Sequence, residues 1–262
     1  MIKKYDLIKV AHMYYNLGYN QQEIAERLHT SRPRVSRLLK SALDEGIVRI
    51  HVEGYKDSCV ELESRLEEVY HLKAARVVEQ GRSESGTLDI ARFLDSFVED
   101  GMNVGVTFGS SLARLAASAG FHPREGVSVV QLAGGLNYNE QIFTPDEIAR
   151  RFAHMLGGKA YSMFIPAIVS NLLLKELIKQ ENMQQKIFDL YRRIDLAFLA
   201  VGAMLPIDVL VRDGYMSQEM FDSLRKKSAV GNVCFRFFDQ EGRIVDPEIT
   251  ERVTGISNED IL

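Results

Sequence analysis

The sequence predicts an α/β protein in which a small all-α helix-turn-helix head precedes a larger, mainly parallel α/β body. Three observations support this prediction. Apolar residues recur at helical spacing through residues 6–45. After residue 57, helical stretches alternate with short apolar runs, which is typical of a parallel sheet covered on both faces. Charge follows the same division, because residues 1–54 carry a net charge of +3 and residues 55–262 one of −7.

Composition limits the class of protein. The chain has 262 residues, of which 46% are apolar and 26% charged, as in an ordinary globular protein with a sizeable core. This length suits one large and one small domain, and we expect them at residues 1–54 and 55–262. The overall charge of −4 excludes a general coat for nucleic acid, so only the basic head is expected to approach a polyanion.

The sequence shows no sign of a metalloprotein, a secreted protein or a membrane protein. Cys59 and Cys234 form no metal-ligand or disulfide pattern, and the six histidines contain no pair at metal-ligand spacing. The first residues lack the apolar core of a signal peptide. The longest uncharged run, residues 160–174, is too short to cross a membrane. We expect a cytoplasmic protein with no metal, no cofactor and no catalytic residues.

The head is expected to begin with a helix over residues 6–17, because its apolar side chains share one face and Gly18 can end it in a left-handed conformation. A short second helix should follow over residues 21–28. Asn20 is a suitable N-cap for it, with Glu23 completing a capping box. A helix of about two turns is not stable alone, so it must pack against a neighbour.

The third helix is expected over residues 32–45, directly after a tight turn. Thr30 or Ser31 can cap it, and Pro33 suits its first turn, where a missing N–H costs nothing. Gly46 can end it. Its side chains divide between two faces. The buried stripe consists of Val35, Leu38, Leu39 and Ala42, and the opposite face carries Arg32, Arg34, Ser36, Arg37 and Lys40.

Two short helices joined by a tight turn form a helix-turn-helix, whose second helix lies in the major groove of DNA. Arg32 and Arg37 are placed to donate two hydrogen bonds each to guanine. His29 stands where glycine is more usual in the turn, at some cost in backbone strain, and can reach a phosphate. The candidate DNA-binding residues are Gln21, Gln22, His29, Thr30, Ser31, Arg32, Arg34, Ser36, Arg37 and Lys40.

The alternative interpretation of this head is a solvated helical hairpin whose arginines only keep the protein soluble. Apolar spacing alone would leave that alternative open. However, five basic residues lie between Arg27 and Lys40 with no acidic residue among them. The turn, the spacing and this charge together favour DNA binding, because a basic stripe along one helix is the electrostatic signature of a nucleic-acid-binding surface.

The rest of the chain is expected to alternate strands and helices. A short strand over residues 47–54 should close the head. The expected helices of the body cover residues 58–72, 86–98, 111–119, 145–156 and 171–193. Its expected strands cover residues 74–79, 102–108, 127–133, 159–165, 195–202 and 232–239.

In parallel α/β sheets, ligands bind beyond the carboxyl ends of the strands. The first such end carries small residues and hydroxyls that suit an anion at the start of a helix, namely Thr107, Phe108, Gly109, Ser110 and Ser111. Gly134 and Gly135 follow another strand and let the backbone approach a ligand closely. Gly202 follows a third. Three such ends in one sheet predict a small-molecule pocket that can accept a phosphate.

Several segments together carry a family resemblance. The head sequence YNQQEIAERLHTSRPRVSRLLKSALDEGIVRI resembles the head of the SorC family of bacterial transcriptional regulators. The segments NVGVTFGSSLARLA, VVQLAGGLN, DLAFLAVGA and AVGNVCFRFFDQEGRIV resemble successive blocks of that family's sugar-binding body. The resemblance implies a homotetrameric regulator of a carbohydrate operon. It would bind double-stranded operator DNA through the head and sense a sugar or sugar phosphate through a body similar to sugar-phosphate isomerases.

The resemblance also implies which residues hold the effector. It assigns the anion loop and a second ligand segment, with two later residues nearby: Thr107, Gly109, Ser110, Ser111, Gln131, Gly134, Gly135, Asn232 and Asp239. Ala133 stands where some relatives carry a lysine, which excludes a Schiff base from that position. Asn232 stands where relatives usually carry Asp or Glu. The family continues beyond the position of Leu262, so the chain is expected to lack a C-terminal segment with a further ligand lysine.

Two other functions compete with this one. A sugar-phosphate isomerase or deaminase with an appended DNA-binding head needs a carboxylate base and a proton-shuttling partner in the pocket, and no such pair can be assigned. A serine recombinase or a sigma-like protein would share the head, but residues 55–262 contain nothing that resembles a recombinase catalytic block. We therefore expect a sequence-specific regulator.

Overall fold

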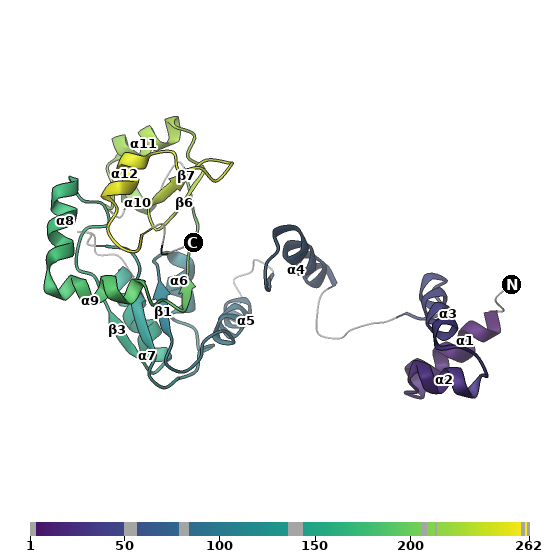
Figure 1. Cartoon of the computed structure of the whole chain (residues 1–262). Helices are drawn as coiled ribbons and strands as arrows, with labels where there is room; N and C mark the ends of the chain where they lie inside the picture. The colour runs from purple at the N-terminus through teal and green to yellow at the C-terminus, as the bar shows by residue number, and fades with distance from the viewer. Residues whose placement is uncertain are drawn as a thin grey trace. The chain divides into compact units, whose positions relative to one another are not determined.

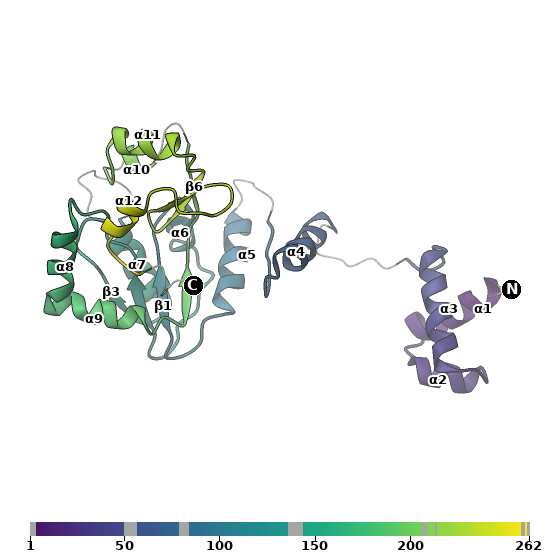
Figure 2. The same cartoon turned by 45° about the horizontal axis from the view of Figure 1, so that its top comes forward.

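The computed structural model describes residues 4–49, 57–78, 84–135, 144–205, 209–212, 214–257 and 260 (Figures 1 and 2). The chain forms two compact units, Met1–Arg65 and Leu66–Leu262. The domain boundary expected after residue 54 lies outside the described residues. The predicted fold class, a helix-turn-helix head with a mainly parallel α/β body, is confirmed.

The first unit is built from short helices around one apolar core (purple in Figure 1). Its helices are α1 (Lys4–Ala11), the π-helical turn η1 (His12–Asn16), α2 (Gln21–Arg27) and α3 (Arg32–Asp44). Leu7, Ile24 and Val35 bring these three α-helices together in the core, each at most 1% exposed. Because helices this short are not stable alone, the shared core holds them in place.

Local backbone signals set the ends of the head helices as expected. Asn20 Oδ1 accepts hydrogen bonds from the N–H groups of Gln22 and Glu23 at 2.9 and 3.0 Å. The Glu23 carboxylate accepts one from the Asn20 N–H at 2.8 Å, so the predicted capping box is confirmed. Gly18 and His29 adopt left-handed backbone, with φ of 72° and 50°, at the ends of the first two helical segments.

Asn20→Ala is expected to lower the free energy of unfolding of the first unit by about 1 kcal/mol, because it leaves two amide donors of α2 without their acceptor. The measurement is thermal unfolding of the full chain followed by circular dichroism. Asn16→Ala is the matched control, since Asn16 is exposed and its side chain makes no hydrogen bond in the described part of the chain. Equal melting temperatures for the two variants would contradict the prediction.

Two details of the head differ from expectation. Ser31 occupies the N-cap position of α3, but neither it nor Thr30 caps the helix through its side chain. Pro33 lies in the first turn as predicted, so the helix begins correctly without that bond. Residues 47–49 are not in a strand, because the Val48 N–H bonds back to Ala42 at the end of α3. The rest of the expected strand, residues 50–54, lies outside the described residues.

The second unit contains a four-stranded parallel sheet in the order β3-β2-β1-β4. The strands are β1 (Asn103–Val106), β2 (Ser128–Gln131), β3 (Lys159–Tyr161) and β4 (Leu196–Phe198). Val104 aligns with Val129 on one side and with Leu196 on the other. Each strand lies within a segment predicted from the sequence.

Helices cover both faces of this sheet because successive strand residues point in opposite directions. Val129 packs with α5 (Glu84–Asp95), α6 (Ser110–Leu115) and α7 (Pro145–Met155), in a core that also contains Phe152. Val130, the next residue, packs on the other face against Tyr191 of α9 (Asn182–Tyr191). The predicted two-layered covering of the sheet is therefore present.

A second, antiparallel sheet has the order β5-β6-β7. Its strands are β5 (Gly202–Ala203), β6 (Gly231–Val233) and β7 (Arg236–Phe238). With α10 (Val209–Arg212), α11 (Gln218–Lys226) and α12 (Pro247–Arg252), it forms a layer at one end of the parallel sheet (Figures 1 and 2). Because β5 follows β4 within the same polypeptide run, this layer stands beyond the carboxyl ends of the parallel strands.

Three predictions for the body are wrong in detail. Residues 232–239 form the hairpin β6–β7 rather than one strand, because Cys234 and Phe235 take φ of 49° and 61° and reverse the chain. The long helix expected over residues 171–193 is two helices, α8 (Leu172–Gln180) and α9, separated at Glu181, whose backbone is extended. Residues 74–78 of the strand expected at 74–79 are irregular.

The described helices are all short. The longest is α4 (Asp57–Tyr70), with 14 residues, whereas crossing a bilayer takes about 20 apolar residues. No helix in the described ranges is long and apolar enough to span a membrane. Nor do the described residues contain a group of three or more His, Cys, Asp or Glu that could hold a metal ion.

Candidate functional site

The exposed face of α3 carries the basic residues that were expected to reach DNA. Arg32, Arg34, Arg37 and Lys40 are all exposed, whereas Val35, Leu38, Leu39 and Ala42 are buried. Arg32 and Lys40 are two helical turns apart with Ser36 between them, so these three lie in one row along the helix. The helix therefore separates an apolar face, which holds the head together, from a cationic face that is open to solvent.

The charge of this face is not neutralised within the head. Among the described residues, none of the four cations makes an ion pair, and the one bond recorded is a long one from Arg37 Nε to the Pro33 carbonyl at 3.4 Å. Exposed guanidinium groups of this kind are available for base edges and phosphates. Arg27 is also exposed, and its guanidinium lies over the Tyr19 ring at 4.1 Å.

The remaining candidates lie around the turn and the start of α2. His29 is exposed, and its left-handed backbone directs the chain from α2 into α3. Thr30 is half-buried, and its N–H bonds to the Ala25 carbonyl at 2.9 Å. Gln22 is exposed but bonded to Glu26 at 3.0 Å, and Gln21 is half-buried at the first position of α2.

A cavity of about 240 Å³ lies where β1 and β4 end and the smaller sheet begins. Seven of the predicted effector-binding residues line it: Thr107, Phe108, Gly109, Ser110, Ser111, Gly202 and Asn232. The walls come from three segments that are far apart in the chain. The topology accounts for this meeting, because β1 and β4 are neighbours in the parallel sheet and β5 pairs with β6.

Thr107 lines the cavity and is held in place by hydrogen bonds of its hydroxyl and its N–H. Its hydroxyl accepts a hydrogen bond from the Ala200 N–H at 3.0 Å, and its own N–H donates to the Phe198 carbonyl at 3.1 Å. Thr107 is 3% exposed, so it joins the ends of β1 and β4. Gly109 has φ of 137°, which residues with a side chain rarely adopt. The exposed hydroxyls of Ser110 and Ser111 follow it at the start of α6.

Asn232 supplies a buried amide to the same cavity. Its residue is 7% exposed, and its side chain makes no hydrogen bond within the described residues. Its amide nitrogen would be 2.6 Å from a β-carbon placed on Gly202, the residue opposite it in the β5–β6 ladder. Glycine is therefore required there for the amide to keep its position. The amide opens onto the cavity, where a ligand with hydroxyl groups would find both a donor and an acceptor.

Four other predicted residues do not line this cavity. Gln131 is 1% exposed and its amide bonds to Ala133 and Met163, so it joins β2 to the chain after β3. Gly134 and Gly135 allow close contact between chain segments, since added β-carbons would lie 2.2 Å from the Thr254 hydroxyl and 2.3 Å from Pro145. Asp239 closes the turn after β7 by accepting bonds from two N–H groups at residues 241 and 243.

Sequence reasoning missed several lining residues. Cys234, Ala200, Val201, Leu205 and Leu210 also face the cavity. Cys234 arrives there through the β6–β7 hairpin, for which the sequence has no glycine or proline signal. Val201 is 72% exposed and Leu205 is 60% exposed, but this exposure is visible only in the folded chain, so the sequence carries no signal that marks this wall.

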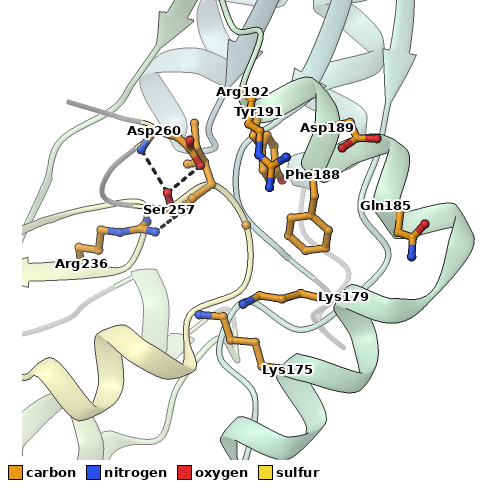
Figure 3. Close-up of a pocket in the computed structure, with 12 residues that line it drawn as sticks. Lys175, Lys179, Gln185, Phe188, Asp189, Tyr191, Arg192, Arg236, Ser257 and Asp260 are labelled. Carbon is orange, nitrogen blue, oxygen red and sulfur yellow. Dashed lines mark hydrogen bonds between the residues drawn. The ribbon is translucent and has the colours of Figure 1, made fainter.

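A second hollow of about 500 Å³ lies between α8, α9 and residues 255–257 and 260 (Figure 3). Lys175 and Lys179 extend from α8 toward it, and Arg236 approaches from the opposite side. Burial, followed by the neighbouring charges of Lys179 and Arg236, lowers the pKa of Lys175. None of the predicted ligand-binding residues lines this hollow, and Glu176 and Glu251 offset part of its charge.

Comparison with known proteins agrees with this geometry. Residues 56–262 match the sugar-binding domain family known as Sugar-bind, and residues 9–45 match region 4 of sigma-70 factors. The deoxyribonucleoside regulator of Bacillus subtilis (strain 168) is 33% identical over 260 residues, which cover 97% of this chain and 83% of the relative. The sorbitol operon regulator of Klebsiella pneumoniae is 25% identical over 258 residues, covering 95% and 82%.

The fold has a solved counterpart over the full length. The crystal structure of the full-length sorbitol operon regulator SorC from Klebsiella pneumoniae matches with a TM-score of 0.70 and 24% identity, covering 98% of this chain and 85% of that one. A helix-turn-helix head on a sugar-binding body defines a DNA-binding transcriptional regulator. The chain belongs to the SorC-like family of sugar-binding regulators, as its sequence predicted.

Proposed function

We propose that this protein is a sequence-specific regulator of a carbohydrate operon, controlled by a sugar or sugar phosphate bound in the cavity lined by Thr107, Gly109 and Asn232. The observation that carries this proposal is the amide of Asn232, which makes no hydrogen bond within the described residues and lines a cavity with two serine hydroxyls. Sugar hydroxyls donate and accept hydrogen bonds, so they match an amide, and the serine-lined start of α6 suits an anionic group.

The proposed DNA-binding surface is the cationic face of α3. Four exposed cations without ion pairs in the described residues lie on the helix that a helix-turn-helix places in the major groove. We further propose a homotetramer, as the resemblance to the SorC family implies. A symmetric pair of its heads would read two half-sites about 34 Å apart or a multiple of that distance. Effector binding would then alter the packing of the copies and so the spacing of the heads.

The effector proposal is tested by a thermal-shift screen of the full chain against sugars and sugar phosphates. A ligand at a hundred times its dissociation constant stabilises the bound state by about 2.7 kcal/mol, which is enough to raise the melting temperature by several degrees. The hit is then titrated against variants. A screen in which no member of either class shifts the transition would contradict the proposal.

Asn232→Leu is expected to weaken binding of the effector found in this screen by about tenfold, because it keeps the volume of the side chain but removes its donor and acceptor. Isothermal titration calorimetry measures the change. Asn182→Leu, an exposed asparagine at the start of α9, is the matched control and should bind like the parent. Unchanged affinity in Asn232→Leu would remove Asn232 from the site.

A further inference from the structure

The second hollow, of about 500 Å³, gathers basic side chains from two parts of the body (Figure 3). Lys175 and Lys179 lie one helical turn apart on α8, so both leave the same side of that helix. Arg236 comes from β7 of the smaller sheet and lines the hollow from the opposite side. All three belong to the second compact unit, so their meeting does not depend on where the DNA-binding head lies.

Arg236 is the most deeply buried of these three cations, at 9% exposed. Its guanidinium donates a hydrogen bond to the Cys234 carbonyl at 3.0 Å and another to the Ile256 carbonyl, so the backbone holds it in place. These two acceptors are neutral, and they orient the guanidinium without cancelling its charge. In such a poorly hydrated position, a cation attracts an anion that reaches it more strongly than it would in water.

The two lysines are only partly compensated by neighbouring carboxylates. Lys175 Nζ donates to the Glu251 carbonyl at 2.6 Å, which is again a neutral acceptor. Lys179 pairs with Glu176 at 2.8 Å, but the two side chains are 41% and 59% exposed, so water screens the pair. Burial, followed by the charges of Lys179 and Arg236, lowers the pKa of Lys175. The three cations are therefore close enough to repel one another, and an anion among them would relieve that repulsion.

Two carboxylates line the same hollow. Asp260 accepts a hydrogen bond from the Ser257 hydroxyl at 2.6 Å, and Asp189 is exposed on α9. In Figure 3 both carboxylates lie toward the end away from the lysines, and the Phe188 ring lies between Asp189 and the lysines. A ligand with an anionic group at one end and hydroxyl groups at the other matches this division, because carboxylates accept hydrogen bonds from hydroxyls.

We propose that this hollow is a second ligand site of the body and that it binds a small phosphorylated molecule. The phosphate lies among Lys175, Lys179 and Arg236, since charged donors from two directions suit its several oxygens. Small-molecule sites have volumes of roughly 300–1,000 Å³, so the hollow has room for more than a free phosphate. Among the described residues, none lines both this hollow and the cavity that contains Asn232, so the two sites can be tested separately.

Inorganic pyrophosphate is the probe for the basic end, because it offers phosphate oxygens alone. Isothermal titration calorimetry of the full chain at fixed ionic strength should show binding by the parent. The double variant Lys175→Gln/Lys179→Gln should weaken that binding by about tenfold, since it removes two charged donors and keeps most of the side-chain length. Lys186→Gln is the matched control for lost charge and should bind like the parent, because Lys186 is exposed on α9 and does not line the hollow.

Folding of the double variant is checked by thermal unfolding followed by circular dichroism. Its melting temperature should stay close to that of the parent, because it removes mutually repelling charges. If the double variant is unstable, Lys179→Gln alone replaces it, since this change keeps the bond between Lys175 and Glu251. The single variant should weaken pyrophosphate binding by a smaller factor than the pair. A folded variant that binds pyrophosphate as tightly as the parent would overturn the proposal, as would a parent chain that does not bind it.

The remaining outcomes separate this site from the effector cavity. The double variant should keep its affinity for the effector found by the thermal-shift screen, so the loss of pyrophosphate binding leaves the proposed function intact. If Asn232→Leu weakens pyrophosphate binding and the double variant does not, the anion lies in the effector cavity. That result would overturn the second site while supporting the proposed function.

Discussion

An Arg37→Ala chain is expected to bind its operator about 1–3 kcal/mol more weakly than the parent chain. Arg37 is exposed on α3 and makes no ion pair within the described residues, so removing it costs the head little stability. Operator sequences can be selected from random duplexes with the parent protein. Fluorescence anisotropy at fixed salt concentration then gives the dissociation constants, because affinity for DNA depends strongly on salt.

The salt dependence distinguishes the two ways in which Arg37 could act. If it reads a base, the variant relaxes the preference at one position of the selected sequence and keeps the parent's salt slope. If it contacts phosphate, all sequences weaken alike and the slope falls by about one. Lys9→Ala, which removes an exposed charge from α1, is the matched control for lost charge. Equal affinities of parent and Arg37→Ala would exclude Arg37 from the interface.

A Phe235→Ala chain is expected to lose about 3–5 kcal/mol of the free energy of unfolding of the body. Phe235 is fully buried, and its ring stacks on Phe108 at 4.8 Å and lies 5.5 Å from Tyr215. Alanine leaves a cavity beneath Phe108, which lines the proposed effector cavity. We therefore expect weaker effector binding as well as a lower melting temperature, both measurable by scanning calorimetry with and without ligand.

Phe164→Ala is the control for this prediction. Phe164 is 61% exposed, so its truncation should change the free energy of unfolding by no more than about 0.5 kcal/mol. Phe235 has left-handed backbone, with φ of 61°, and alanine at this position would carry about the same strain. The loss of stability in Phe235→Ala therefore reports the loss of the ring. A Phe235→Ala chain as stable as Phe164→Ala would show that the smaller sheet does not depend on this ring.

The sequence predicted well those features that depend on neighbouring residues. The capping box needs only Asn20 and Glu23, three positions apart, and both its bonds are present. The opposite directions of Val129 and Val130 follow from strand periodicity, so the two covered faces could be foreseen. The chain reversal at Cys234 and Phe235 could not, since neither residue favours left-handed backbone.

In the candidate site, too, only the features that depend on neighbouring residues could be predicted from the sequence. Thr107 and Ser110 were found because they follow a predicted strand and open a helix, which is local information. Gln131 was assigned only by the family resemblance, and its amide is bonded to Met163, 32 positions away. Only the folded chain reveals such a partner. Whether a polar side chain is free for a ligand therefore depends on contacts that spacing along the sequence does not contain.

The bond between Thr107 and Ala200 has a mechanical consequence. It anchors one wall of the proposed effector cavity to the parallel sheet, while the facing wall, with Asn232, belongs to a separate three-stranded sheet. Only residues 199–201 link β4 to β5. A ligand in this cavity would therefore contact residues of both sheets at once. Substitutions in the smaller sheet alone would change the wall that contains Asn232, while the wall joined by Thr107 and Ala200 stays the same.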